Sequence, residues 1–398
     1  MSNRSQIILK RKKDHSLLRK HPWVFSGAIH SPTDHLEEGS VVDVVNSEGL
    51  FLGTGHFQIG SISVRVFEYD QLADLDQAYW NERFARIVEL RRTLGFIDNN
   101  ETTIFRLCHA EGDGMPGLVI DMYHGTAIIQ CHSIGMWLIR EQIVEALKIN
   151  LGDQLLAVYD KSAETLPYKA DIEPENGYLH GEDNAIKKGF EYGIEFAIDW
   201  ETGQKTGFFI DQRENRALLG KFSKDKKVLN TFCYSGGFSM YALKAGATEV
   251  HSLDSSKKAI ELVEQNLQLL DSSLHAKHKS IVADAVKYIR DLGDTFDVIV
   301  LDPPAFAKHV KARHKAIQAY KRLNRRAMEQ LQPGGILFTF SCSQVVTKDL
   351  FNGAILAAAI EANREVKILH QLHQPADHPI NIYHPESEYL KGLVVQVN

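Results

Sequence analysis

The spacing of hydrophobic residues changes twice along the chain, and the first pattern ends near residue 70. Apolar runs at 41–45, 50–55 and 62–67 are separated there by turn residues such as Asn46-Ser-Glu-Gly49. Short β-favouring runs broken by Gly, Asn and Ser are typical of strands joined by hairpins. The pattern therefore predicts a small, strongly curved β module at the N-terminus.

A second pattern extends to about residue 190. A helical period begins at Asp76 and ends before Gly95, and strand-like runs follow at 118–121 and 127–131. Acidic, glycine-containing sequence at 173–182 suits a linker. We therefore predict an α+β segment whose first helix buries one apolar face, formed by Trp80, Phe84, Ile87, Val88 and Leu94.

The third pattern, from about residue 191, is a regular alternation of strands and helices. Five such units predict a mostly parallel, doubly wound α/β sheet, which binds ligands beyond the carboxyl ends of its strands. The strand candidates are 227–230, 249–253, 280–282, 297–301 and 336–340, with helical stretches at 257–270 and 312–331. We expect domains at 1–72, 73–190 and 191–398.

Three consecutive strand ends of this sheet carry residues that suit a cofactor. A glycine turn, Asn230 to Phe238, follows the first strand, Asp254 ends the second and Asp284 follows the third. The turn lacks G-x-G-x-x-G, which disfavours a dinucleotide, whereas a carboxylate at the second strand end can hold ribose hydroxyls. The set favours an adenosine without phosphates, for which S-adenosylmethionine is the commonest cofactor. Ordinary turns with N-cap aspartates are the alternative.

The fourth and fifth strands end in residues that suit a reaction. Asp302-Pro-Pro-Ala-Phe306 stops the fourth strand and leaves Asp302 at the rim of the sheet, and Cys342 ends the fifth strand beside it. A lone cysteine at a strand end is more often a packing residue. The neighbouring Asp302-Pro-Pro favours a nucleophile, for which we expect a lowered pKa near cationic groups.

Composition restricts the compartment and the partners. The chain has 398 residues, 44% hydrophobic and 24% charged, and a net charge of −6, so any polyanion site must be a local patch. Four separated cysteines and the lack of a His ligand motif predict neither disulfides nor a metal site. No apolar run is long enough to span a membrane, and we expect a cytoplasmic protein that binds no membrane. One basic patch precedes His21, with a single acid, Asp14, among Arg4, Lys10, Arg11, Lys12, Lys13, Arg19 and Lys20.

The chain closely resembles the bacterial large-subunit ribosomal RNA cytosine-5 methyltransferases that carry an N-terminal PUA domain. The resemblance implies a Rossmann-like class I methyltransferase domain that uses S-adenosylmethionine, preceded by a PUA domain and an α+β middle domain. It also implies 23S rRNA as the substrate class. The segments that carry it span nearly the whole chain: 20–27, 111–118, 203–216, 230–238, 302–308, 341–343, 377–379 and 389–391.

The resemblance implies site residues. Cys342 matches the family's nucleophile, and Asp302 would orient the base or take a proton. Many RNA cytosine-5 methyltransferases hold a second cysteine after the proline of the fourth-strand motif, and this chain has none there. We assign that role to none of Cys108, Cys131 and Cys233. The expected cofactor-binding residues are Phe208, Gln212, Arg213, Asn230, Phe232, Tyr234, Ser235, Gly236, Asp254, Asp284 and Asp302.

RNA is the expected partner, and the arginines and lysines of the basic patch would contact its phosphates. Trp23 and Phe25 could stack on a base, although a place in the core of the module is the favoured interpretation. For Lys308, Arg313 and Lys315, a solvated helix face and a phosphate contact are equally consistent. Whether the protein is a homodimer is left open. The expected RNA-binding residues are Lys10, Arg11, Lys12, Lys13, Arg19, Lys20, Lys308 and Arg313.

Two other functions remain as alternatives. An exocyclic-nitrogen methyltransferase holds its amine with an acidic or amide residue followed directly by Pro-Pro and an aromatic. Here Ala305 interrupts that spacing and Cys342 would have no role. A non-catalytic RNA-binding protein would be expected to lose Asp254, Asp302 or Cys342, and all three are present.

Overall fold

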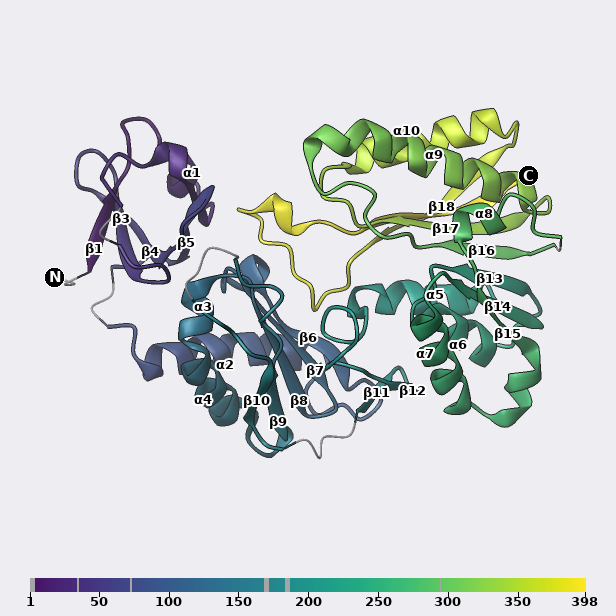
Figure 1. The fold of residues 1–398 in the computed structure, drawn as a ribbon, viewed down its shortest axis with the longest axis horizontal. Coiled ribbons are helices and arrows are strands. Elements are labelled where there is room, and N and C mark those ends of the chain that lie inside the picture. The colour runs from purple at the N-terminus through teal and green to yellow at the C-terminus, as the bar shows by residue number, and fades with distance from the viewer. Residues whose placement is uncertain (1–3, 34–35, 72–73, 168–171, 183–186, 294) are drawn as a thin grey trace. The chain divides into compact units, whose positions relative to one another are not determined.

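The structure is a computed structural model that describes residues 4–33, 36–71, 74–167, 172–182, 187–293 and 295–398 (Figure 1). The chain divides into two compact units. The first unit holds Met1–Phe190, Ile198–Phe208 and Ala376–Ser387, and the second holds Glu191–Ala197, Phe209–Pro375 and Glu388–Asn398. The expected domain boundary after residue 72 lies outside the described residues.

The first unit begins with a five-stranded sheet in the order β1-β3-β4-β5-β2. Most residues of its central strands are buried, and Ile7, Val24, Val42 and Val64 lie in its small core. The three strands predicted for this module are confirmed as β3, β4 and β5. The elements are β1 (Ser5–Ile8), α1 (His15–Leu18), β2 (Trp23–Phe25), η1 (Ser26–Ala28), β3 (Val41–Val45), β4 (Phe51–Phe57) and β5 (Ile62–Glu68).

A second five-stranded sheet follows in the same unit, in the order β10-β9-β8-β7-β6. Asp76 caps α2, where its side chain accepts the Tyr79 N–H at 3.0 Å. Four of the five residues predicted for the apolar face of this helix are buried, and Leu94 is its partly buried C-cap. The elements are α2 (Gln77–Thr93), β6 (Ile104–His109), η2 (Ala110–Asp113), β7 (Leu118–Tyr123), β8 (Thr126–Cys131), α3 (Ile134–Leu138), α4 (Arg140–Leu151), η3 (Gly152–Gln154), β9 (Ala157–Asp160) and β10 (Gly177–His180).

The linker predicted at 173–182 is wrong in part, because β10 lies inside it and pairs with β9. Tyr178 packs edge-on against Tyr159, with ring centroids 5.0 Å apart, and Leu179 contacts the core. These apolar contacts stabilise a strand despite the acidic flanks. The hairpin of β11 (Lys188–Glu191) and β12 (Ile194–Ala197) follows.

The second unit is built on a seven-stranded sheet in the order β15-β14-β13-β16-β17-β19-β18. The five predicted strands are confirmed, and wherever two of them are adjacent they run parallel. The sequence did not predict β18 and β19; β19 runs antiparallel to both β17 and β18. Strand order reverses between β13 and β16. The strands are β13 (Lys227–Thr231), β14 (Glu249–Asp254), β15 (His278–Val282), β16 (Val298–Leu301), β17 (Gly335–Ser341), β18 (Val366–His373) and β19 (Lys391–Val397).

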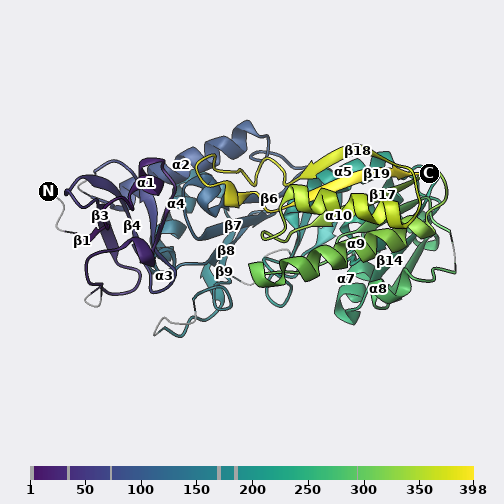
Figure 2. The same cartoon turned by 90° about the horizontal axis from the view of Figure 1, so that it is seen from above.

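Helices cover both faces of this sheet. In Figure 1, α9 and α10 lie on one face and α5, α6 and α7 on the other. Figure 2 shows α9 and α10 side by side. Within the described ranges, no helix is long and apolar enough to cross a membrane. The helices are η4 (Ile210–Gln212), α5 (Arg213–Lys221), α6 (Gly237–Lys244), α7 (Lys257–Gln268), η5 (Ser272–Lys277), α8 (Ala285–Tyr288), η6 (Val310–Ala312), α9 (Arg313–Gln330), α10 (Lys348–Glu361) and, in the first unit, η7 (Pro385–Ser387).

Candidate active site

The turn between β13 and α6 has an unusual backbone. Phe232, Tyr234 and Gly236 have φ values of 55°, 47° and 78°. The N–H groups of Cys233 and Gly236 donate to the carbonyls of Leu253 and Cys233, at 3.1 and 2.8 Å, which holds the turn closed. The φ of Gly236 favours glycine, and a Cβ there would lie only 3.2 Å from side-chain atoms of Met240 and Val263. The predicted glycine turn is therefore confirmed as a tight, constrained loop.

Asp254 holds this turn in place from the end of β14. Its Oδ2 accepts the Tyr234 N–H at 3.1 Å and its Oδ1 accepts the Ser256 N–H at 2.9 Å. Asp284 has a simpler role, because its Oδ1 accepts the Lys287 N–H at 2.9 Å and caps α8. The N-cap interpretation is thus observed for Asp284, and its contact with a cofactor stays a prediction.

Two other predicted cofactor residues are tied to the interior. The Asn230 side chain is buried and donates to Ser239 Oγ at 2.9 Å, and Ser239 in turn contacts Ser252 at 2.6 Å. Ser235 is buried, and its carbonyl accepts the Asn266 amide at 2.8 Å. These bonds attach the turn to β14, α6 and α7, so both residues position the loop backbone.

Asp302 lies at the end of β16, held by a short chain of amides. Gln212 Nε2 donates to Asp302 Oδ2 at 3.0 Å, and Asn215 Nδ2 donates to Gln212 Oε1 at 2.6 Å. Burial and the neighbouring Asp211 carboxylate raise the pKa of Asp302 to about 7, against the opposing effects of Gln212 and Arg216. An acid with this pKa can exchange a proton near neutral pH.

Cys342 follows β17 and is partly exposed. Burial first, and then the carboxylates of Asp302 and Asp211, raise the pKa of its thiol to about 11; its own backbone N–H and Lys391 act in the opposite direction. The expected lowering of this pKa is therefore wrong for the protein without ligands. The physical reason is that burial and two carboxylates outweigh a single lysine.

The sequence did not predict two charged groups near Cys342, Lys391 and Asp211. Lys391 pairs with Ser341 across β17 and β19, and its Nζ donates to the Ser343 carbonyl at 2.8 Å. Burial lowers the pKa of Lys391 to about 8, although Cys342 and Glu388 raise it. The segment 389–391 was noted only as part of the resemblance. Because β19 was not predicted, the sequence did not place Lys391 beside β17.

Asp211 is the other missed residue. Tyr389 donates to its Oδ2 at 2.7 Å, and its Oδ1 is buried without a hydrogen-bond partner among the residues that the structure describes. An unsatisfied buried carboxylate oxygen attracts a donor or a cation. The one signal in the sequence was that Asp211 directly precedes Gln212, a predicted cofactor residue.

Buried charges fix the start of α5. Arg216 binds Glu191 through two bonds, of 2.7 and 2.6 Å, and also donates to the Phe209 carbonyl at 2.9 Å. Arg213 is fully buried and its Nε donates to Glu214 at 3.3 Å. Phe208 is buried in the first unit, so its contact with a cofactor stays a prediction.

The predicted RNA-binding residues are all exposed. Lys10, Arg11, Lys12 and Lys13 lie in the turn between β1 and α1, and Arg19 and Lys20 follow α1 in the same unit. Lys308 and Arg313 lie before and at the start of α9 in the second unit. The favoured core position of Phe25 is wrong, since 48% of its surface is exposed. Trp23 is half-buried and donates to Glu111 at 2.8 Å.

The residues at these strand ends fit S-adenosylmethionine. The tight turn at 232–236 lets a ligand approach the backbone closely, and Asp254 offers a carboxylate at the ribose position. The Oδ1 of Asp211, which has no hydrogen-bond partner among the described residues, suits a cationic ligand. Residues 164–390 match the family described as S-adenosylmethionine-dependent methyltransferase, and residues 7–69 match a PUA-like domain. This chain belongs to the S-adenosylmethionine-dependent methyltransferases. S-adenosylmethionine is therefore its cofactor, as the strand ends predicted.

Relatives match this methyltransferase over its full length. Proteins named ribosomal RNA large subunit methyltransferase I are 41% identical in Shewanella denitrificans and 39% identical in Pseudoalteromonas atlantica, covering 98% and 99% of this chain and 99% of each relative. Among solved structures, SMU.776, assigned as a methyltransferase and complexed with SAH, has a TM-score of 0.83 and 24% identity. It covers 99% of this chain and 100% of its own, which shows the fold.

Proposed function

We propose that this methyltransferase transfers a methyl group from S-adenosylmethionine to C5 of a cytosine in large-subunit ribosomal RNA, with Cys342 as the nucleophile. The observation that carries the proposal is the partly exposed thiol of Cys342, which directly follows β17, beside Asp302, which directly follows the neighbouring strand β16. The names of the relatives and the PUA-like domain support large-subunit rRNA as the substrate.

The chemistry of cytosine explains why a cysteine is needed. C5 is too weakly nucleophilic to take a methyl group directly. Addition of the Cys342 thiolate to C6 breaks the C5–C6 double bond and makes C5 enamine-like. C5 is then nucleophilic enough to attack an electrophilic methyl group. The bound cofactor supplies an electrophilic methyl group on a sulfonium. Removal of the C5 proton by a base then restores the double bond and expels the thiolate.

The chain's own groups suit both formation of the Cys342 thiolate and removal of the C5 proton. Lys391 stabilises the Cys342 thiolate, since it is the nearby cation that lowers the pKa of the thiol. Asp302, with a pKa near 7, can take a proton at neutral pH and is the proposed group that orients the base or accepts the C5 proton. A cation bound near Asp211 and Asp302 would offset the two carboxylates that hold the pKa of Cys342 high.

RNA binding is proposed to involve the exposed basic residues of the β module. Lys10, Arg11, Lys12, Lys13, Arg19 and Lys20 surround α1, and lysine and arginine contacts to phosphate position RNA without reading its sequence. Lys308 and Arg313 are proposed to hold phosphates near the reacting base. A cytoplasmic location follows from this substrate.

A product analysis tests the proposal. Large-subunit rRNA lacking modifications is incubated with the protein and methyl-labelled S-adenosylmethionine, digested to nucleosides and separated by chromatography and mass spectrometry. We expect 5-methylcytidine from the wild-type protein and none from Cys342→Ala, with Cys131→Ala as the matched control at a buried cysteine. Labelled N4-methylcytidine, or activity retained by Cys342→Ala, would replace this proposal with methylation of an exocyclic nitrogen.

A further inference from the structure

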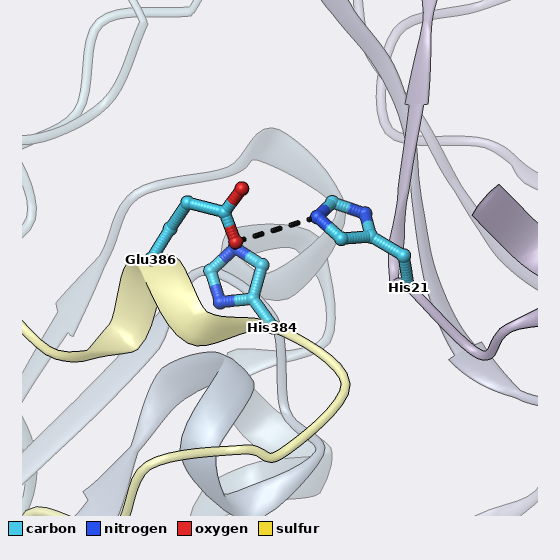
Figure 3. Close-up of side chains that lie close together, drawn as sticks. All are labelled: His21, His384 and Glu386. Atoms are coloured by element: carbon cyan, nitrogen blue, oxygen red, sulfur yellow. Dashed lines mark ion pairs between the residues drawn. The ribbon is translucent and has the colours of Figure 1, made fainter.

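Three potential metal-ligating side chains meet in the first unit, whereas the strand ends described above belong to the second. His21 lies between α1 and β2, whereas His384 and Glu386 belong to the segment 376–387 (Figure 3). The Glu386 Oε2 lies 3.5 Å from His21 Nε2 and 3.8 Å from His384 Nε2, and the three ligand atoms all lie within 4.8 Å of one another. Because the two histidines lie 363 positions apart, no local spacing in the sequence revealed this cluster.

The hydrogen bonds of His384 direct a lone pair into the cluster. Ser387 Oγ donates to the His384 carbonyl at 2.8 Å and therefore accepts the bond from His384 Nδ1, also at 2.8 Å. The proton of the neutral ring is then on Nδ1, and Nε2 carries the lone pair. This atom is buried and has no hydrogen-bond partner within the described part of the chain.

A lone pair that faces a carboxylate is unfavourable unless a positive charge lies between them. The imidazole is held firmly, since its ring centroid lies 4.3 Å from that of Trp23. The Trp23 indole in turn donates to Glu111 at 2.8 Å. The side chain is therefore fixed with an unsatisfied acceptor directed at Glu386.

His21 can complete the set through a change of tautomer. Its Nδ1 accepts the Trp23 N–H at 3.2 Å, which places the ring proton on Nε2, facing Glu386. Metal binding at Nε2 moves this proton to Nδ1 and breaks the Trp23 bond, which is at the long end of the normal range. Bonds to the metal replace a weak hydrogen bond, and the side chain keeps its position.

We propose that His21, His384 and Glu386 bind one divalent transition-metal ion of the zinc class. Two imidazoles and a carboxylate suit such ions, whereas calcium and magnesium require oxygen ligands. Glu386 is half-exposed, which leaves a coordination position for water. The Ser387 bond to His384 is the kind of outer contact that orients a metal-bound histidine. The ion would fasten the segment 376–387 to the β module and act as a structural site.

Metal titration of the full chain tests the site. Metal-free protein is titrated with Co²⁺, whose visible absorption reports four- or five-coordination, and its Zn²⁺ affinity is measured by competition with a chromophoric chelator. We expect one ion per chain, and a Zn²⁺ affinity at least tenfold lower in Glu386→Gln and in His384→Gln. His15→Gln, at an exposed histidine of α1, is the matched control and should bind as the wild type does.

The thermal midpoint provides a second readout. Saturating Zn²⁺ should raise the midpoint of the wild type and of His15→Gln, and leave that of Glu386→Gln unchanged. Glu386 is half-exposed, so its variant should fold even if His384→Gln does not. Failure of Co²⁺ to give a low-coordinate spectrum, or equal Zn²⁺ affinity in the wild type and Glu386→Gln, would overturn the proposal. Neither readout depends on methyl transfer.

Discussion

At the scale of single residues, the strand ends of the second unit concentrate negative charge. Asp211 and Asp302 both raise the pKa of Cys342, and Asp211 raises that of Asp302. Lys391 opposes them, with a pKa that burial brings down to about 8. Such a site disfavours further negative charge and favours a cation. The cationic sulfonium of S-adenosylmethionine is therefore the kind of ligand that relieves it, and the thiolate becomes easier to form when that ligand is bound.

Asp302 should make the protein less stable as the pH rises. Its pKa in the folded protein, about 7, lies above the ordinary value of 3.8 for this carboxyl group. Its stabilising contribution is therefore complete below pH 4 and is lost as the pH rises toward 7. Asp302→Asn removes this dependence. Between pH 5 and pH 8 we expect the variant to gain roughly 1 to 2 kcal/mol of unfolding free energy relative to the wild type, after allowance for partial exposure.

Urea unfolding at the two pH values measures this difference. Asp291→Asn, at an exposed carboxylate, is the control and should follow the wild type. Parallel pH profiles for the wild type and Asp302→Asn would mean that Asp302 titrates normally.

Lys391 should control the reactivity of Cys342. Replacement by Met removes the nearby cation that lowers the pKa of the thiol, so less thiolate forms. We expect the alkylation rate of Cys342 by iodoacetamide to fall by about three- to tenfold at neutral pH, and its pH profile to move upward. The other three cysteines are buried, which makes the signal specific.

Lys367→Met, on the neighbouring strand β18, is the matched control. Lys367 is exposed and pairs with Glu365 at 3.2 Å. The proposed role of Lys391 is wrong if both variants alkylate at the wild-type rate.

At the scale of elements, buried charge and strand pairing place the active-site groups. Arg216 of α5 binds Glu191 of β11 with both side chains nearly inaccessible to solvent. The same guanidinium contacts the Phe209 carbonyl just before η4, where Asp211 and Gln212 lie. The ion pair thus fixes the segment that carries two residues of the site.

Breaking this ion pair should be costly. Arg216→Met leaves Glu191 charged and buried, and we expect a loss of about 3 to 5 kcal/mol in unfolding free energy, measured by urea denaturation. The double variant with Glu191→Met should recover part of the loss because it removes the unpaired charge. Arg326→Met breaks a more exposed bond to Glu329 and should cost less than about 1 kcal/mol. Equal losses for the two arginine variants would contradict the role of burial.

Strand patterns in the sequence predicted the parallel part of the sheet well. Each of its five strands is a short apolar run followed by a turn or a cap, and the ends of β13, β14 and β16 carried recognisable residues. The missed strand β18 is mostly exposed, so it lacks a continuous apolar run. Pairing of β19 with β17 places Lys391 next to Cys342, whereas Asp211 is held by a bond from Tyr389 and acts on Cys342 through its charge. No local pattern encodes these relations.

At the scale of the whole molecule, the net charge of −6 makes RNA binding depend on local basic surface. Lysine and arginine contacts to phosphate release counterions, so they increase the salt dependence of binding. We expect Arg11→Ala, Lys12→Ala and Lys13→Ala together to weaken RNA binding and to reduce the slope of log K against log salt by about 2 to 3. Filter binding at several salt concentrations measures this slope.

A matched triple variant separates this effect from net charge. Lys221, Lys224 and Lys226 are exposed and lie near the amino ends of β13, β16 and β17, opposite the strand ends of the site. Their replacement by Ala removes the same charge and should leave the slope unchanged. An equal change in both triples would show that binding follows total charge, without a role for the patch around α1.

The most direct test of the account is covalent trapping. The protein is incubated with S-adenosylmethionine and rRNA containing 5-fluorocytosine, whose fluorine cannot be removed as a proton, so the adduct at C6 persists. We predict a denaturation-resistant protein–RNA complex in the wild type and in Cys131→Ala, and none in Cys342→Ala. Methylation of normal rRNA by Cys342→Ala, with no trapped complex in the wild type, would contradict covalent catalysis by Cys342.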